Sequence, residues 1–249
     1  MTAELRTEGI GKAFGGVQAL EDCTLTVPAG SITGLIGPNG SGKTTLFNIV
    51  TGYERPDTGE VYLDGRRITG ASAQRVFRLG LGRTFQLTRI FPRLTLLENM
   101  LVAAGGTPAG RQRAHELLAF TGIERYARAP AGTLSYGQRK LLELATVLAA
   151  QPAVVLLDEP AGGVNPTLIQ QLADRIRDLN AQGTTFLIVE HNMEFVMGLC
   201  HQVTVLDHGT VVAAGPPDLI GRDPRVLDAY LGTALDDTAL DDAGEPGDR

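Results

Sequence analysis

Tryptophan is absent from this 249-residue sequence, aromatic residues make up only 5% of it, and there are just two cysteines. Cys23 and Cys200 are far apart and form no Cys-x-x-Cys pair, which argues against a zinc site and a disulfide framework and fits a reducing compartment. No apolar run reaches the roughly 20 residues of a membrane-spanning helix, and residues 1–6 lack the apolar core of a signal peptide. If the protein acts at a membrane, we expect other chains to cross the bilayer.

Positive charge is also scarce, which limits the classes of partner. The formal net charge is −6, and residues 235–249 account for most of it, because six acidic residues there face only Arg249. The remainder is close to neutral, whereas a broad nucleic-acid-binding face is usually rich in lysine and arginine. We therefore expect no nucleic-acid partner. The acidic segment 233–249 holds few apolar residues and is predicted to be a disordered tail.

The strongest pattern lies at residues 37–45, which read Gly-Pro-Asn-Gly-Ser-Gly-Lys-Thr-Thr. It matches G-x-x-x-x-G-K-[ST], in which backbone N–H groups surround a triphosphate, the lysine reaches its outer oxygens and the next hydroxyl holds Mg²⁺. An apolar strand at 32–36 precedes it and a helix at 44–50 follows, the order that anion binding at a helix N-terminus requires. A glycine-rich turn without a ligand is the weaker alternative. The predicted nucleotide-binding residues of this loop are Gly37, Pro38, Asn39, Gly40, Ser41, Gly42, Lys43, Thr44 and Thr45.

The apolar pattern along the chain predicts the class of fold. Short strand-like runs dominate the first third, helical periodicity dominates the middle, and strands then alternate with helices. This order predicts an α/β fold with a parallel sheet and a β-rich edge, interrupted by an all-helical insertion. The predicted strands are 25–27, 32–36, 61–63, 154–157, 186–189 and 203–206, and the predicted helices are 44–50, 96–103, 111–120, 139–149 and one that carries residues 168–179.

Two acidic residues, Asp158 and Glu159, follow the apolar run at 154–157. They are placed at the carboxyl end of a buried strand, where α/β sheets bind their ligands. Asp158 would hold Mg²⁺ directly or through water, and Glu159 would orient and deprotonate an attacking water. Two acids can also simply end a strand, but their coincidence with the phosphate loop favours the catalytic interpretation.

Residues 134–138, Leu-Ser-Tyr-Gly-Gln, have two explanations of equal weight. Ser135 and Gln138 form the pattern of a capping box at the start of a helix. That explanation does not account for Gly137, because glycine in a first turn weakens a helix. A hydroxyl and a bare backbone N–H at a helix N-terminus also suit an anion, so both explanations stay open at this point.

Four further residues have plain structural explanations when each is taken alone. Asn165, followed by proline, fits a helix cap, and His191 fits a hydrogen-bonded strand end. Gln86 fits any polar strand terminus. Phe14 fits either the core or a position that stacks on a nucleotide base.

Taken together and in this order, the motifs resemble those of the ATPase subunits of ABC transporters, over about residues 5–232. The resemblance favours nucleotide contact for Ser135, Gly137 and Gln138 and functional roles for Gln86 and His191. The implied motifs are an adenine-stacking Phe14, the Walker A loop at 37–45, the Q-loop Gln86, the signature motif at 134–138, Walker B at 154–158 with Glu159, the D-loop at 161–165 and the switch residue His191.

The resemblance also implies a division of the chain and a set of roles. A P-loop NTPase core would comprise about 1–86 and 151–232, with an antiparallel β subdomain, and an α-helical subdomain would be inserted at about 87–150. ATP and Mg²⁺ are implied, and two subunits, alike or different, would sandwich two ATP molecules head to tail. Implied catalytic residues are Lys43, Glu159 and His191, and implied metal-binding residues are Thr44, Gln86 and Asp158.

Within this superfamily, the chain looks most like the ATPases that serve uptake of branched-chain and other hydrophobic amino acids. The similar stretches are 82–86, 136–138, 158–166, 190–193 and 230–232. This likeness implies a peripheral position at the cytoplasmic face of the inner membrane. It also implies multi-spanning permease subunits that dock at 86–98, a second ATPase subunit and, indirectly, a solute-binding protein.

Other branches share parts of the pattern. Urea-uptake and lipopolysaccharide-export ATPases share much of it, and a soluble ABC ATPase of iron–sulfur cluster assembly shares every core motif. Tyr136 and Asn165 replace the commoner glycine and aspartate, as they do in the amino acid uptake branch. The stretch 101–133 is shorter than the usual helical arm of that branch, and this difference bears on the permease contact.

Overall fold

Two β-sheets form the framework of residues 2–86 and 88–230, the part of the chain that the computed structural model describes. The antiparallel sheet has the order β2-β1-β4-β5, with strands β1 (Leu5–Phe14), β2 (Val17–Val27), β4 (Thr58–Leu63) and β5 (Arg66–Arg67). The larger sheet has the order β10-β9-β3-β8-β7-β6, with strands β3 (Ile32–Ile36), β6 (Leu81–Arg83), β7 (Val154–Asp158), β8 (Thr185–Val189), β9 (Gln202–Asp207) and β10 (Thr210–Gly215). All neighbours in the larger sheet are parallel except β9 and β10.

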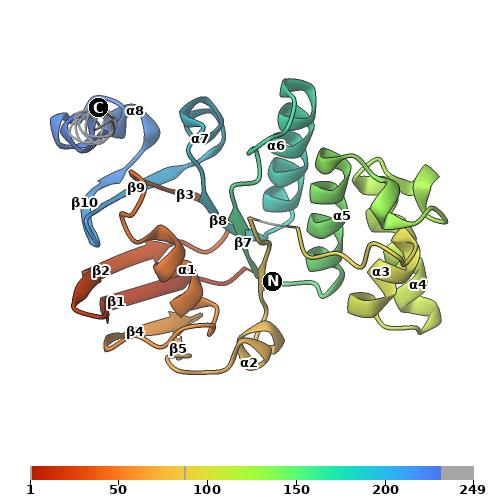
Figure 1. Ribbon diagram of the computed structural model, residues 1–249, viewed down its shortest axis with the longest axis horizontal. Coiled ribbons are helices and arrows are strands. Elements are labelled where there is room, and N and C mark those ends of the chain that lie inside the picture. Colours follow the sequence, from red (N-terminus) through yellow and green to blue (C-terminus); the bar gives the residue numbers. More distant parts are fainter. Residues whose placement is uncertain (1, 87, 231–249) are drawn as a thin grey trace, which may run out of the picture.

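Helices cover the larger sheet and extend beyond one end of it (Figure 1). They are α1 (Lys43–Val50), α2 (Ala73–Arg78), α3 (Leu96–Ala104), α4 (Pro108–Phe120), α5 (Tyr136–Ala149), α6 (Pro166–Ala181), α7 (Met193–Leu199) and α8 (Pro217–Ile220), with short 3₁₀ turns at Glu124–Tyr126 and Ala131–Thr133. Helices α3, α4 and α5 gather at the end of the molecule opposite β10 and α8. Helix α5 lies between α6 and the pair formed by α3 and α4.

The larger sheet is buried on both faces, which explains its apolar strands. In β7, Val155 and Leu157 belong to the core that extends into the helical part, whereas Val154 and Leu156 belong to the core beneath the antiparallel sheet and α1. All five residues of β7 are buried, as expected of a parallel strand covered on both sides. This packing fixes the carboxyl ends of β7 and β8, and therefore whatever side chains follow them.

The helical part between β6 and β7 shares the apolar core of one face of the larger sheet and has well-formed helix caps. Leu96, Met100 and Leu118 are fully buried within it. Thr95 and Glu98 form a capping box at the start of α3, and the side chain of Thr107 accepts a hydrogen bond at the start of α4. These caps satisfy backbone N–H groups that a helix otherwise leaves without partners.

The predicted α/β class, with an antiparallel sheet and a helical insertion, is confirmed. The strand at 32–36 has the predicted bounds, and the other predicted strands and helices are present with longer bounds. The sequence patterns missed β1, β5, β6, β10, α2, α7 and α8. β1 was missed because its pairing with β2 shifts register at three places, which breaks the alternation of buried and exposed residues. The predicted tail at 233–249 lies outside the described residues.

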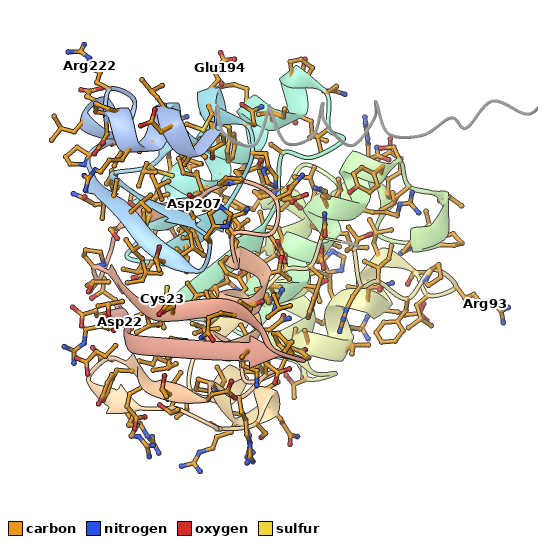
Figure 2. The ribbon with its side chains drawn as sticks, turned by 60° about the vertical axis from the view of Figure 1, so that its left-hand side comes forward. Asp22, Cys23, Arg93, Glu194, Asp207 and Arg222 are labelled. Atoms are coloured by element: carbon orange, nitrogen blue, oxygen red, sulfur yellow. The ribbon has the colours of Figure 1, made fainter. Side chains whose placement is uncertain are left out.

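The two cysteines are free and buried. Cys23 lies on β2 (Figure 2), and Cys200 follows α7. Burial raises the pKa of each thiol to about 12, so both thiols are uncharged at neutral pH. Among residues 2–86 and 88–230, no helix combines the length and the apolar character needed to cross a bilayer.

Candidate active site

The loop between β3 and α1 folds around the ammonium group of Lys43. Lys43 Nζ donates hydrogen bonds to the carbonyl oxygens of Gly37 (2.8 Å) and Pro38 (2.6 Å). Gly42, just before the helix, has a φ of 102°, and a Cβ atom there would lie 2.5 Å from the carbonyl oxygen of Ala19. Both the backbone conformation and the available space therefore require glycine at this position.

A pocket of about 270 Å³ lies beside this loop. Three of its side chains come from distant parts of the chain: Gln86 follows β6, Glu159 follows β7 and His191 follows β8. Because β6, β7 and β8 are parallel neighbours, their carboxyl ends meet at one edge of the sheet. The other lining residues are Ala19, Asn39, Gly40, Gly42, Lys43, Thr44, Thr45 and Val189.

Glu159 connects the polar groups of this pocket. Its Oε1 lies 3.0 Å from His191 Nε2, and its Oε2 accepts a hydrogen bond of 3.0 Å from Gln86 Nε2. Glu159 has a φ of 47°, a left-handed conformation that is uncommon for residues other than glycine. A carboxylate held from two sides and facing a pocket is well placed to accept a proton from a bound water.

The pKa of Lys43 in this pocket depends on its burial and on two neighbouring carboxylates. Burial lowers the pKa of Lys43 from its ordinary value of 10.5, and the negative charges of Glu159 and Asp158 oppose this effect. A buried ammonium group in such a loop is suited to strong charge-assisted hydrogen bonds with phosphate oxygens.

Asp158, at the end of β7, is paired with a buried arginine that the sequence patterns did not indicate. Arg83 Nη2 lies 2.9 Å from Asp158 Oδ2, and the two side chains are only 6% and 8% exposed. Through Nη1, the same guanidinium donates a 2.7 Å hydrogen bond to Asn48 Oδ1 on α1. Removal of one partner from such a buried pair typically costs about 3–5 kcal/mol, so Arg83 holds the side chain of Asp158 in place beside the loop.

The residues beside the loop fit a magnesium ion. The hydroxyl of Thr44, the amide oxygen of Gln86 and the carboxylate of Asp158 are oxygen donors, the type that Mg²⁺ prefers. Among the described residues, no group of three or more His, Cys, Asp and Glu side chains is arranged so that it could hold a metal ion by itself. The protein would therefore supply only part of the coordination shell, and phosphate oxygens and water would complete it.

Ser135, Gly137 and Gln138 lie at the start of α5 and are not among the described residues that line the pocket. Ser135 N donates to Gln138 Oε1 (2.9 Å), and Gln138 N donates to Ser135 Oγ (3.3 Å), so the capping box is confirmed. Gly137 also has a packing explanation that the sequence alone does not indicate. A Cβ atom there would lie 2.3 Å from Leu168 Cδ2, so glycine lets α5 begin close to α6.

The structure bears on the alternatives left open for Phe14 and for Asn165. Phe14 ends β1 with a 46% exposed ring, and Lys12 Nζ lies 5.1 Å from the ring centroid, so the core alternative is wrong. Phe14 is not among the described residues that line the pocket, and its stacking role stays a prediction. Asn165 caps α6, because its Oδ1 accepts a 2.9 Å hydrogen bond from the backbone N–H of Leu168.

Two charged side chains of α5 also reach the site, and the sequence patterns missed both. Lys140 Nζ donates a hydrogen bond to the carbonyl oxygen of Glu159. Glu143 Oε1 accepts hydrogen bonds from the backbone N–H groups of Phe85 (3.1 Å) and Arg89 (3.2 Å). A signal was present, because Glu143 interrupts an apolar stretch of the helix, and a fully buried carboxylate requires partners.

Glu143 makes the stability of the protein depend on pH. Burial raises the pKa of its carboxyl from 4.5 to about 7, against the opposing influence of the two backbone hydrogen bonds and of the charges of Lys140 and Arg89. A folded-state pKa above the unfolded value means that the free energy of unfolding falls as pH rises from 4.5 to 7. In Glu143→Gln, which keeps an acceptor oxygen without the charge, we expect this loss to disappear. In urea unfolding at pH 5–8, the free energy of unfolding of the variant should rise relative to that of the wild type as pH increases, by about 3 kcal/mol at most.

A second glutamate provides a control of opposite sign. Hydrogen bonds from the backbone and side chain of Thr95 lower the pKa of Glu98. Its contribution to stability is therefore present at neutral pH and lost as pH falls through the folded-state pKa. Glu98→Gln should lose stability relative to the wild type at pH 7 and approach it in acid. If the free energy of unfolding varied with pH in the same way in Glu143→Gln and in the wild type, Glu143 would not be the source of the pH dependence.

Comparisons with known proteins agree with this geometry. Residues 20–162 match the ABC transporter family. The chain is 39% identical over 250 residues to the high-affinity branched-chain amino acid transport ATP-binding protein LivG of Salmonella typhimurium, covering 92% of this chain and 98% of LivG.

Solved structures show the same similarity. The ADP conformation of MJ1267, an ATP-binding cassette of an ABC transporter, is 33% identical, with a TM-score of 0.84 over 93% of this chain and 99% of that one. A dimeric post-hydrolysis state of the ATP-binding cassette MJ0796, bound to ADP and Pi, is 26% identical, with a TM-score of 0.77 over 86% of this chain and 98% of that one.

Proposed function

This chain belongs to the ABC transporter family, and from that premise we propose that it is the ATP-binding and ATP-hydrolysing subunit of a membrane transporter, one that takes up branched-chain or other hydrophobic amino acids. The observation that carries the ATPase assignment is the convergence of Gln86, Glu159 and His191 on the pocket beside the phosphate loop. The LivG similarity supports the class of solute.

The chemistry follows from the side chains of the pocket. Lys43 would bind the outer phosphate oxygens of ATP, and the backbone N–H groups of the loop would bind the others. Glu159 would take a proton from the attacking water, with Gln86 and His191 orienting its carboxylate. Mg²⁺, held by Thr44, Asp158 and Gln86, would neutralise charge on the phosphates. His191 would stabilise the charge that develops on the transferred phosphoryl group.

The position of the signature residues supports a dimer. Ser135, Gly137 and Gln138 lie at the N-terminus of α5, where the helix dipole favours an anion, but they are not among the described residues that line this chain's own pocket. We propose that they complete the pocket of a second ATPase subunit, identical or similar, and that this subunit's signature completes the pocket here. The dimeric MJ0796 cassette supports such an arrangement.

A second hollow supports docking on a permease. A groove of about 330 Å³ is lined by the aromatic side chains of Tyr53, Phe77 and Phe85, and Tyr53 and Phe77 are 53% and 44% exposed. The loop before α3 carries Arg93 outward at the same end of the fold as the helical part (Figure 2). We propose that a cytoplasmic segment of a multi-spanning permease docks here and along 86–98. The subunit would then lie at the cytoplasmic face of the inner membrane.

We also propose a division of the chain that follows these roles. Residues 1–86 and 151–232 would form the nucleotide-binding core with its antiparallel sheet, and residues 87–150 would form the helical subdomain that carries the signature. The stretch 101–133 would set the fit to a particular permease, because its helices belong to this subdomain.

The test is affinity purification of Glu159→Gln from its native membrane with ATP present. Slow hydrolysis should hold the assembled complex, so we expect two multi-spanning subunits, a second ATPase and a solute-binding protein to be retained. Purification without nucleotide serves as the control. Recovery of soluble scaffold proteins alone would contradict the transporter assignment.

A further inference from the structure

Helix α5 carries two ionisable side chains that the proposed reaction does not use. Lys140 and Glu143 are three residues apart, so they lie on the same face of the helix. Glu143 is 5% exposed, and Lys140 is partly buried. Burial lowers the pKa of Lys140, while four nearby carboxylates oppose this effect. Charged groups in such surroundings destabilise a fold unless they make specific contacts, so their partners indicate what they do.

Lys140 contacts the backbone of Glu159. Its ammonium group donates a hydrogen bond to the Glu159 carbonyl oxygen. The φ of 47° at Glu159 is unfavourable for a side-chain-bearing residue and persists only where surrounding contacts hold it. The backbone N–H of Glu159 donates to the carbonyl oxygen of Val189 (2.9 Å), and its carbonyl oxygen accepts from the backbone N–H of Gly162 (3.2 Å) and from Lys140, so Lys140 is the side chain that helps to hold this residue.

Glu143 contacts the segment that carries Gln86. The two amides that donate to Glu143 Oε1, those of Phe85 and Arg89, lie on either side of Gln86 in the chain. Gln86 in turn donates to the Glu159 carboxylate at 3.0 Å. Helix α5 therefore reaches Glu159 by two routes, through its carbonyl group and through its carboxylate.

We propose that Lys140 and Glu143 are positioning residues that set the Glu159 carboxylate according to the position of α5. This rests on the proposed role of Glu159 as the base and of the α5 N-terminus as the part that meets the second subunit. Because Ser135 and Gly137 begin the same helix, a displacement of α5 when two subunits close would act at once on the Glu159 backbone and on Gln86. Closure and hydrolysis would then be coupled within the subunit.

The role of Lys140 is tested by removing the charge of its side chain while keeping a similar length. In Lys140→Met, we expect kcat for ATP to fall roughly 10- to 100-fold, the size of effect that about 1 Å of misplacement causes, while the Kd for ATP changes less than about twofold. Lys140→Arg should recover most of kcat. Arg139→Met is the matched control, because Arg139 Nε has no hydrogen-bond partner among the described residues. Unchanged kcat in Lys140→Met, or an equal loss in Arg139→Met, would overturn the proposal.

Glu143 is tested with a readout other than activity. In Glu143→Leu, hydrogen exchange of the Phe85 and Arg89 amides, followed by NMR, should quicken roughly tenfold, because each loses a partly buried hydrogen bond. Glu143→Gln keeps the acceptor and should preserve both the protection and kcat. Unchanged exchange rates in Glu143→Leu would overturn the role of Glu143. If that variant does not fold, the kcat values of the Lys140 variants test the proposal instead. Glu159→Gln is assayed in parallel, because normal turnover there would reject Glu159 as the base, whereas the hydrogen-exchange result tests the contacts of Glu143 independently of that role.

Discussion

Glu159→Gln is expected to lower ATP turnover roughly 10²- to 10⁴-fold, the range that a positioned general base contributes. The amide has nearly the same shape and can still contact His191 Nε2 and Gln86 Nε2, both 3.0 Å from the carboxylate in the wild type. It has no basic oxygen to take a proton from water. Binding of ATP should persist, because the phosphate loop and Lys43 are unchanged.

The measurement combines phosphate release with size-exclusion chromatography. With ATP and Mg²⁺ present, the variant should accumulate as a closed dimer, since the nucleotide that bridges the subunits is no longer consumed. Glu194→Gln is a suitable control, because Glu194 lies on α7 shortly after His191 and its exposed side chain projects outward (Figure 2). Normal turnover in Glu159→Gln would remove this residue from the role of base.

Lys43→Ala is expected to weaken ATP binding roughly 10- to 100-fold, as loss of hydrogen bonds from a charged donor predicts. The ammonium group lies within the loop, 2.8 Å and 2.6 Å from the carbonyl oxygens of Gly37 and Pro38, where phosphate oxygens would compete for it. Burial lowers its pKa, so the charge itself costs stability, and the hydrogen bonds that the ammonium group donates offset that cost. The melting temperature should therefore change little.

Calorimetric titration with ATP, accompanied by thermal unfolding, separates these effects. Lys43→Met preserves most of the volume and should lose affinity to a similar extent, which assigns the loss to charge. Unchanged affinity in both variants would contradict the role of the loop as a phosphate cradle. A large fall in melting temperature would instead indicate that Lys43 holds the loop together.

Local features of the fold could be read directly from the sequence. The strand at 32–36, the loop at 37–42 and the helix after it follow from an apolar run, from glycines at positions that need them and from a helix start, all within 20 residues. The same holds for the acidic pair after β7 and for the caps at Ser135 and Asn165. Local backbone preferences and contacts between residues close in sequence decide these features, so the pattern of residues along the chain is enough to predict them.

The contacts that organise the site were not visible in the sequence. Arg83 and Asp158 are 75 residues apart, Phe85 and Glu143 are 58 apart, and Gln86 and Glu159 are 73 apart. The contact between Gly137 and Leu168 of α6 joins two helices and likewise has no local signal. No pattern of local propensity specifies such pairs, because they form only when the parallel order of β6, β7 and β8 and the docking of α5 bring the segments together.

The sequence by itself therefore determined the chemistry available to this protein: a phosphate loop with its lysine, two carboxylates at a strand end, and a capped helix start that suits an anion. Only the tertiary structure decided which of these groups line the same pocket and which do not. The physical reason is that backbone conformation is set within a few residues, whereas a buried charge such as Glu143 is stabilised by partners that the fold supplies from a distance.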